Sequence, residues 1–284
     1  MRLVVALPST VVAEANSLLE KTVKIGFMAR ALSIFKVKEL LIYRDVSTEV
    51  DEGRLVGKLF EYAICPQYLR KKLFPLDPDL KYVGILPPLN TPNHPMEKSI
   101  EELPDVTYRE GLVVSRKGRK CLVDVGLDRN VVLYNAGELK KGDRVVLKIT
   151  KKNGTIEAYK VKREDVPQYF GYEVCITDFN LKGVISSFKG RALIVATSRY
   201  GRNINEDAPI LVERMKEHRY SVLLLFGSPF RGLYELAKRE GFDLDKTVDM
   251  VLNFVPEQGV RTVRVEEALY STLAIINFLY HYFK

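Results

Sequence analysis

Cysteine and histidine are both scarce in this chain, with three of each among 284 residues. The cysteines are Cys65, Cys121 and Cys175, and the histidines are His94, His218 and His281. Both sets are widely scattered, and an odd number of cysteines does not complete a disulfide framework. Neither set has the spacing of zinc ligands. We therefore expect a reduced, intracellular protein that holds no metal ion.

Long apolar runs are missing too. No stretch reaches the roughly 20 apolar residues that a membrane-spanning helix needs. The apolar segment 3–7 near the N-terminus is too short for a signal peptide. Hydrophobic residues make up 46% of the chain and charged residues 28%, as in ordinary globular proteins. We expect a soluble, cytoplasmic protein that is large enough for two domains.

Several catalytic motifs are also absent. No Gly-x-Gly-x-x-Gly sequence follows a predicted strand, so a Rossmann dinucleotide site is not supported. Residues 53–59 resemble a phosphate-binding loop, but the segment is one residue short. Leu59 also stands where a Ser or Thr would contact magnesium. No Ser/His/Asp or Cys/His set is visible.

Positive charge is what the chain has in excess. The formal net charge is +8 and the sequence pI is about 9.2. Such a balance favours a polyanionic partner, of which nucleic acid is the commonest.

Residues 1–89 alternate between predicted strands and helices. Residues 3–7 and 39–43 are typical of buried strands, and the helical pattern between them predicts a break near residues 21–24. Residues 55–73 follow a helical pattern interrupted at Cys65-Pro66, and residues 81–85 predict a third strand. This alternation is typical of a parallel α/β sheet. Four prolines within residues 87–95 then end the pattern.

Residues 90–166 predict short strands with tight turns and no helix. The strands are expected at 109–114, 120–125, 130–133, 143–150 and 155–161. Asn153-Gly154 between the last two is typical of a hairpin turn. Five such strands predict a small barrel resembling the oligonucleotide-binding (OB) fold. The barrel would be an insertion into one α/β domain that residues 1–89 and 167–284 form together.

The predicted barrel is rich in basic side chains. Those we assign to RNA contact are Arg116, Lys117, Arg119, Lys120, Lys151 and Lys152. Positive charge gathered in turns of one small unit favours RNA binding. Lysines at strand edges also protect against aggregation, which is the alternative explanation.

From residue 167 the α/β pattern resumes. Strands are predicted at 172–177 and 191–196, at 221–226, and before Pro256, and helices at 206–218 and 266–283. Three of these strands end in turns of glycine, proline or small polar residues, after Ala196, Phe226 and Val255. Ligands of open α/β sheets bind outside the carboxyl ends of strands, so we expect a site at these turns. Ordinary strand-to-helix turns contain the same residue types.

The order and spacing of these three turns resemble the SPOUT methyltransferases. The segment 253–268, NFVPEQGVRTVRVEEA, is similar to the knot motif of that class. Segments 69–75 and 169–174 also match its archaeal and eukaryotic subgroup with an inserted barrel. This resemblance covers essentially the whole chain. It implies a trefoil-knotted SPOUT domain, a homodimer, and S-adenosylmethionine held by the three turns.

The resemblance also implies the cofactor-binding residues. They are Thr197, Ser198, Arg199, Phe226, Gly227, Pro229, Asn253, Val255, Pro256, Gln258, Gly259 and Thr262. Backbone amides and carbonyls of tight turns can bind adenine and the methionine ends, and Gly227 allows close approach of the backbone.

Two arginines are the catalytic candidates. Residues 25–37 are similar to the first motif of the ribose-methylating SPOUT branch, in which the arginine at the position of Arg30 is catalytic. Val23-Lys24 replaces the asparagine usual before that motif, and Ser228-Pro229 replaces a glutamate in the second loop. The barrel-inserted subgroup is associated instead with uridine N3 of ribosomal RNA. A guanidinium from Arg30 or Arg199 would stabilise the uracil anion that attacks the methyl group.

Other functions remain open at this point. The chain could be a non-catalytic RNA-binding factor in ribosome assembly, or it could methylate tRNA or a ribose 2′-hydroxyl. A homodimer is expected to form through the helix at 266–283. Its apolar stripe is Leu269, Leu273, Ile276 and Tyr280, and packing within one chain would explain that stripe equally well.

Overall fold

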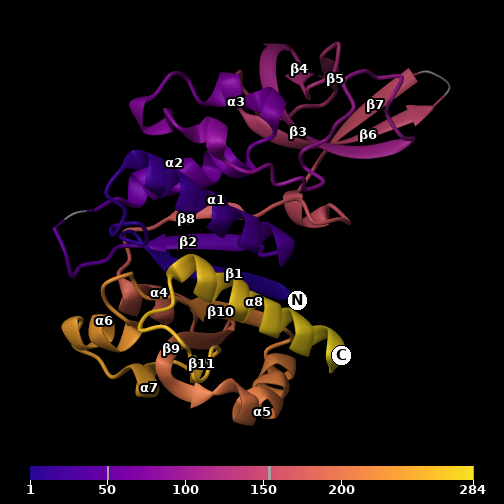
Figure 1. Ribbon diagram of the computed structural model, residues 1–284. Helices are drawn as coiled ribbons and strands as arrows, with labels where there is room; N and C mark the ends of the chain where they lie inside the picture. Colours follow the sequence, from indigo (N-terminus) through magenta and orange to yellow (C-terminus); the bar gives the residue numbers. More distant parts are fainter. Residues whose placement is uncertain (50, 153–154, 284) are drawn as a thin grey trace. The chain divides into compact units, whose positions relative to one another are not determined.

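The computed structural model describes residues 1–49, 51–152 and 155–283. The chain forms two compact units, which Figure 1 shows coloured along the sequence. The first, here the α/β unit, comprises Met1–Ala63, Pro78–Pro88 and Tyr172–Lys284. The second, here the barrel unit, comprises Ile64–Asp77 and Leu89–Gly171. Within the described ranges, no helix has the length and apolar character needed to cross a membrane.

The segment Ile64–Asp77 belongs to the barrel unit, whereas the sequence placed it in the α/β domain. Buried polar groups account for the assignment. The side-chain amide of Asn93 donates to the carbonyl oxygen of Ile64 at 2.9 Å. The hydroxyl of Tyr68 donates to the carbonyl oxygen of Glu110 at 2.7 Å. These partners are 29 and 42 positions apart in the chain, so sequence patterns do not reveal them.

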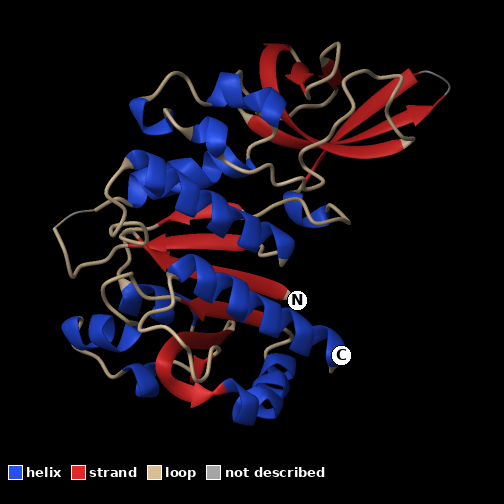
Figure 2. Ribbon diagram, viewed as in Figure 1, coloured by secondary structure: helices blue, strands red, loops and turns tan. Residues whose placement is uncertain are grey.

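A parallel sheet of six strands is the framework of the α/β unit (Figure 2). The strands are β1 (Arg2–Pro8), β2 (Glu39–Tyr43), β8 (Glu173–Ile176), β9 (Leu193–Asn203), β10 (Ser221–Leu225) and β11 (Met250–Asn253). Their order is β11-β9-β10-β1-β2-β8, and every neighbouring pair is parallel. This confirms the predicted α/β class with a parallel sheet.

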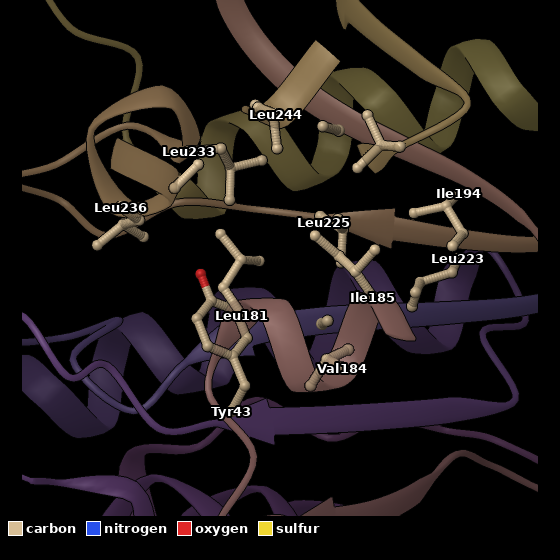
Figure 3. Packing of buried hydrophobic residues seen from close by; sticks show 14 of the residues in the cluster. Tyr43, Leu181, Val184, Ile185, Ile194, Leu223, Leu225, Leu233, Leu236 and Leu244 are labelled. Atoms are coloured by element: carbon tan, nitrogen blue, oxygen red, sulfur yellow. The ribbon is translucent and has the colours of Figure 1, made fainter. Parts of the chain in front are cut away.

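Helices cover both faces of this sheet. They are α1 (Leu18–Ile34), α2 (Gly53–Ile64), α4 (Leu181–Phe188), α5 (Ile204–Glu217), α6 (Leu233–Arg239), α7 (Leu244–Thr247) and α8 (Val265–Tyr282). On one face, Val4 and Ala6 of β1 join a buried cluster with α4, α6 and α7, part of which Figure 3 shows. Val5 and Leu7 alternate to the other face. There α1 and α8 run in front of the sheet in Figure 1.

Helix α1 is continuous where the sequence predicted a break at residues 21–24. It begins after Ser17, whose side chain accepts a hydrogen bond from the Glu20 amide. Lys24 within this stretch forms ion pairs with Glu14 and Glu266, both at 2.7 Å. Burial lowers the pKa of Lys24, but the two carboxylates outweigh it and the net pKa is raised. Lys24 therefore forms ion pairs with Glu14 and Glu266, and the helix continues through this residue.

The strand predicted at residues 81–85 is wrong. Pro78–Leu80 and Val83–Ile85 form short 3-10 helices, η1 and η2. The following chain packs onto α1, where a Cβ on Gly26 would lie 2.7 Å from the Cδ atom of Pro87. The chain at residues 86–87 therefore packs against a helix, and residues 81–85 do not pair in the sheet.

Strand β9 does not end at Ala196 as predicted. Val251 and Leu252 are neighbours in β11, but they pair with Ala196 and Arg202 of β9. The β9 residues between these partners, 197–201, therefore bulge out of the ladder. At the end of the bulge, a Cβ on Gly201 would lie only 2.7 Å from the Leu252 nitrogen and the Val251 oxygen. Glycine is the residue type that permits this backbone approach.

The barrel unit contains the five predicted strands. They are β3 (Val106–Lys117), β4 (Lys120–Asp124), β5 (Val131–Leu133), β6 (Arg144–Lys152) and β7 (Thr155–Val161). Their order is β5-β4-β3-β6-β7, all antiparallel, and β5 and β7 approach each other to nearly close the sheet. The helix α3 (Gln67–Leu73) and the 3-10 helix η3 (Arg163–Asp165) belong to the same unit. The predicted turn at Asn153-Gly154 lies outside the described residues.

We predict that Gly201→Ala destabilises the protein. The added methyl group would collide with the β11 backbone, and overpacking of this kind costs about 1–3 kcal/mol. Thermal unfolding should therefore begin at a lower temperature than in the wild type. Gly84→Ala is the matched control, because no atom lies within 4 Å of its added Cβ. An unchanged unfolding temperature for Gly201→Ala would contradict the close approach of β9 to β11.

Candidate active site

A cavity of about 410 Å³ lies at the bulge inside β9 and at the loops that follow β10 and β11. The three strands are parallel, so the bulge and the two loops meet at one edge of the sheet. The cavity is lined by ten of the twelve residues that sequence reasoning assigned to the cofactor. They are Thr197, Ser198, Arg199, Phe226, Gly227, Pro229, Asn253, Val255, Gln258 and Thr262. Pro256 and Gly259 are in the same loop but not in the lining.

The bulge of β9 supplies the first wall of the cavity. The hydroxyl of Thr197 donates to the carbonyl oxygen of Leu225 at 2.9 Å, which ties the bulge to the end of β10. The side-chain amide of Asn253 donates to the carbonyl oxygen of Arg199 at 3.2 Å, which ties it to the end of β11. The three loops are therefore linked by hydrogen bonds at the point where they converge.

The loop after β10 is closed tightly on itself. The Ser228 amide donates to the carbonyl oxygen of Arg231 at 2.9 Å, and the Arg231 amide donates to the Ser228 hydroxyl at 3.0 Å. A Cβ on Gly227 would lie 2.8 Å from that same Arg231 carbonyl oxygen. This loop holds its backbone so close that position 227 has no room for a side chain.

A buried tyrosine forms a hydrogen bond with the start of the loop after β10. The hydroxyl of Tyr43, at the end of β2, donates to the carbonyl oxygen of Phe226 at 2.8 Å. Burial raises the pKa of Tyr43 well above its ordinary value, and the nearby Asp45 carboxylate raises it further. The hydroxyl therefore stays protonated and keeps its role as donor.

Side-chain amides brace the loop after β11. The Asn253 oxygen accepts from the Val255 amide at 3.0 Å. The Gln258 amide group donates to the carbonyl oxygens of Val260 at 2.8 Å and Arg261 at 3.3 Å. Glu257 between them has φ 53°, in the left-handed region. Asn253 and Gln258 thus fix the shape of the loop through its own backbone.

Arg199 is held at the cavity by three contacts. Its guanidinium donates to the carbonyl oxygen of Arg261 at 2.8 Å and to the hydroxyl of Tyr200 at 2.6 Å. It also lies over the Tyr200 ring, 4.7 Å from the centroid. The positive charge is therefore positioned before any ligand arrives.

Arg30 is elsewhere in the α/β unit. It lies on α1, where its guanidinium donates to the carbonyl oxygen of Pro88 at 3.1 Å. Burial raises the pKa of Tyr270 on α8, and the charge of Arg30 opposes that shift. Arg30 does not line the cavity, so one copy of the chain does not bring the two catalytic candidates together.

Sequence reasoning missed a polar link behind the cavity. Arg231 lines the cavity, forms an ion pair with Glu235 at 3.3 Å, and donates to the Ser47 hydroxyl at 3.0 Å. The Ser47 amide donates to Asp45 at 2.9 Å, and the Asp45 carboxylate also accepts from Thr10 at 2.6 Å. The link joins the loops after β1, β2 and β10. No local pattern announces it, because its members come from distant parts of the chain.

The basic residues assigned to RNA lie at two ends of the barrel unit. Arg116, Lys117, Arg119 and Lys120 flank the β3–β4 turn, where β3 ends. Lys151 lies beside the start of β3, because the preceding residue pairs with Val106. Arg116 donates to the Gly118 and Leu139 carbonyl oxygens at 3.0 and 2.9 Å, and Lys151 to that of Glu101 at 2.6 Å. The structure therefore separates this set into two groups, and the Lys152 side chain is outside the described part.

No grouping of three or more His, Cys, Asp or Glu side chains that could bind a metal ion occurs among the described residues. The polar groups at the cavity are backbone amides and carbonyls, hydroxyls, side-chain amides, the guanidiniums of Arg199 and Arg231, and the carboxylate of Glu235. A set with charges of both signs suits an organic ligand that itself carries both.

Comparison with known proteins identifies relatives along nearly the whole chain. A family model described as "Putative RNA methyltransferase" matches residues 2–276. A 28S rRNA (uridine-N(3))-methyltransferase of Drosophila melanogaster is 32% identical over 308 residues, which cover 96% of this chain and 61% of that protein. The Homo sapiens protein of the same name is 29% identical over 309 residues, covering 96% and 77%. An uncharacterized Haloarcula marismortui protein is 28% identical over 291 residues, covering 96% and 97%.

These matches agree with the resemblance that the sequence motifs suggested. This chain spans 61% of the length of the Drosophila relative. The family model covers both the α/β unit and the barrel unit. The chain belongs to the family described as "Putative RNA methyltransferase".

Proposed function

We propose that this protein transfers the methyl group of S-adenosylmethionine to N3 of a uridine in ribosomal RNA. The observation that carries the proposal is the cavity formed by the bulge of β9 and the loops after β10 and β11. It lies in a chain whose relatives are named uridine-N3 methyltransferases. We further propose that the three loops form a trefoil knot and that the barrel unit is an OB-like module that holds RNA.

The cavity fits S-adenosylmethionine in size and chemistry. Its volume of about 410 Å³ is within the range of about 300–1,000 Å³ common for small-molecule sites. Phe226, Val255, Val265 and Ala268 supply apolar walls, and the loop backbones supply donors and acceptors. A Cβ at position 227 would meet the Arg231 carbonyl oxygen, so glycine allows the loop to stay closed beside the cavity. When bound, the cofactor supplies an electrophilic methyl group on its sulfonium.

Arg199 is the residue we assign to the uracil. Uracil N3 must lose its proton before it attacks, and the resulting charge spreads to the two ring carbonyl oxygens. A fixed guanidinium beside these oxygens stabilises the anion more than the neutral base, which lowers the barrier. The contacts of Arg199 to Arg261 and Tyr200 hold it in place, so little reorganisation is needed.

The dimer surface we propose differs from the stripe expected on the last helix. Leu269, Leu273 and Ile276 are fully buried within the chain, so they are not free to contact a partner. Tyr280 accepts from the N-terminal amine at 3.3 Å and packs edge-on against Tyr220. Exposed apolar residues remain on α1 and α8, which pack together. They are Leu19, Val23, Phe27, Ile34, Phe278 and Tyr282.

Arg30 is on the same helix as much of this surface. A partner that docks on α1 would place its own loops beside Arg30. We propose that Arg30 serves the cavity of the partner chain, either in catalysis or in positioning RNA. This assignment explains why Arg30 is not at the cavity of its own chain.

We predict that Gly227→Trp abolishes cofactor binding, because a side chain at this position would collide with the Arg231 carbonyl oxygen and displace the loop backbone. Calorimetric titration with S-adenosylmethionine should give micromolar binding for the wild type and none for the variant. Gly84→Trp is the control, since open space surrounds that glycine and it does not line the cavity. A wild type that binds RNA but no S-adenosylmethionine, even with RNA present, would instead support a non-catalytic RNA-binding factor.

Arg199→Ala should lower kcat for methyl transfer by about 10²–10³, the usual effect of removing one preorganised donor to a developing anion. Arg199→Lys should recover part of the loss, because it restores the charge without the paired contacts. Single-turnover rates with saturating cofactor separate this effect from cofactor affinity. A kcat within twofold of wild type for Arg199→Ala would remove Arg199 from the mechanism.

Mixing two inactive variants tests whether Arg30 acts across the dimer. Arg30→Ala chains keep an intact cavity, and Gly227→Trp chains keep an intact Arg30. If Arg30 serves the partner, mixed dimers contain one complete site, and activity should recover to about a quarter of wild type in an equal mixture. No recovery, with mixed dimers demonstrated by differently tagged chains, would place Arg30 outside the partner's site.

A further inference from the structure

A second cavity of about 210 Å³ adjoins the first. Tyr200 and Tyr234 line both cavities, so the two spaces share an aromatic wall. The second is otherwise lined by Arg202, Asp207, Ile210, Arg214, Asp245, Asp249, Met250 and Val251. It is smaller than the usual site for a whole cofactor, and its size suits one planar ring.

Two carboxylates of this cavity are committed to the protein itself. The hydroxyl of Tyr234 donates to Asp245 at 2.8 Å. The backbone amide of Ile194 donates to Asp249 at 2.7 Å, and Arg214 donates to the Asp249 carbonyl oxygen at 2.9 Å. Burial and the Asp245 contact raise the pKa of Tyr234 to about 12, so its hydroxyl remains a donor. The walls are therefore fixed by internal hydrogen bonds.

The third carboxylate is different. Asp207 is only 2% exposed, and its Oδ1 atom accepts from Arg202 at 2.7 Å. Its Oδ2 atom is buried and has no hydrogen-bond partner among the described residues. A buried acceptor without a donor is destabilising, because it has lost its hydrogen bonds to water. Asp207 lines the cavity and its partner Arg202 is largely exposed, so a small turn of the Asp207 side chain would present its carboxylate to the N–H groups of a ligand.

The charge and the walls narrow the ligand class. Three aspartates outnumber two arginines, so an anion such as phosphate is disfavoured inside the cavity. Tyr200 is 70% exposed, and an exposed aromatic ring beside an RNA-modifying site is a surface on which a base can stack. The side chain of Arg202 is 68% exposed, and its guanidinium has further N–H groups that can donate to a ligand.

We propose that the second cavity binds a guanine base of the RNA strand next to the uridine that is methylated. Guanine is the RNA base with two adjacent N–H donors beside a carbonyl acceptor. N1–H and N2–H would donate to the two oxygens of the Asp207 carboxylate, Arg202 would donate to O6, and the ring would pack against Tyr200. This inference rests on the proposed RNA methylation and assigns it a sequence preference.

The first test blocks the cavity. Ile210 is 38% exposed and lines the second cavity but not the first, so Ile210→Trp should fill it without touching the cofactor. The control is Asn205→Trp, an exposed position of the same helix outside the lining. The probe is a labelled decaribonucleotide with one uridine between two guanines. With protein saturated by S-adenosylhomocysteine, Ile210→Trp should weaken RNA binding about tenfold, one recognition contact, and the control should not.

The second test changes the base. Inosine lacks the N2 amine of guanine, so inosine beside the uridine should weaken binding to the wild type, and Asp207→Asn should remove that difference. Equal affinity of the wild type for the guanine and inosine probes, or equal RNA affinity of both tryptophan variants, would overturn the inference. Titration of S-adenosylhomocysteine alone keeps the tests separate. Its failure to bind the wild type would overturn the proposed function, whereas normal binding without base discrimination would overturn the second cavity alone.

Discussion

The candidate active site depends on how β9 pairs with β11. Adjacent β11 residues contact β9 residues that are six positions apart, which forces the chain between Ala196 and Arg202 out of the sheet. That displaced segment carries Arg199 and Tyr200 to the cavity. Gly201 permits the close approach of β9 to β11 after the bulge, because any side chain at this position would collide with the β11 backbone. A change in this pairing would move the cavity wall, the guanidinium and the shared tyrosine together.

The surrounding hydrogen bonds make the site rigid before a ligand binds. The side chains of Asn253 and Gln258 form hydrogen bonds with loop backbones, and the Tyr43 hydroxyl donates to the carbonyl oxygen of Phe226. Residues of this kind look like ligand contacts in a sequence motif. Their contacts in the structure indicate that they shape the loops, and that backbone groups and apolar walls are left to meet the cofactor. Preorganised loops reduce the entropy cost of binding.

Much of this architecture could be predicted from the sequence. The strands of both sheets follow from apolar runs and turn residues, and the three site turns follow from their place at strand ends. The failures have a common physical cause, which is long-range contact. The apolar residues at 81–85 predict a strand, but the chain that follows packs Pro87 against Gly26 of α1 and the segment forms a 3-10 helix. The apparent break in α1 is bridged by the pairing of Lys24 with Glu266, 242 positions away.

The segments that form the candidate site could be predicted from the sequence, but the contacts between them could not. The bulge of β9, the link from Arg231 to Ser47, and the unpaired oxygen of Asp207 all depend on which distant segments meet. The basic residues of the barrel unit show the same limit, because β-strand pairing places Lys117 and Lys151 at different ends of β3. The residue types indicate which polar and basic groups the chain carries, and the strand pairing determines where in the fold those groups lie.

The function proposed for this protein is methylation of uridine N3 in ribosomal RNA. The most direct measurement incubates total RNA from cells lacking the protein with purified protein and isotope-labelled S-adenosylmethionine, then separates ribosomal RNA from tRNA and analyses the nucleosides of each by mass spectrometry. We expect the label in 3-methyluridine of ribosomal RNA, and none with the Gly227→Trp variant. Label in a 2′-O-methylated nucleoside, or in tRNA alone, would contradict this proposal.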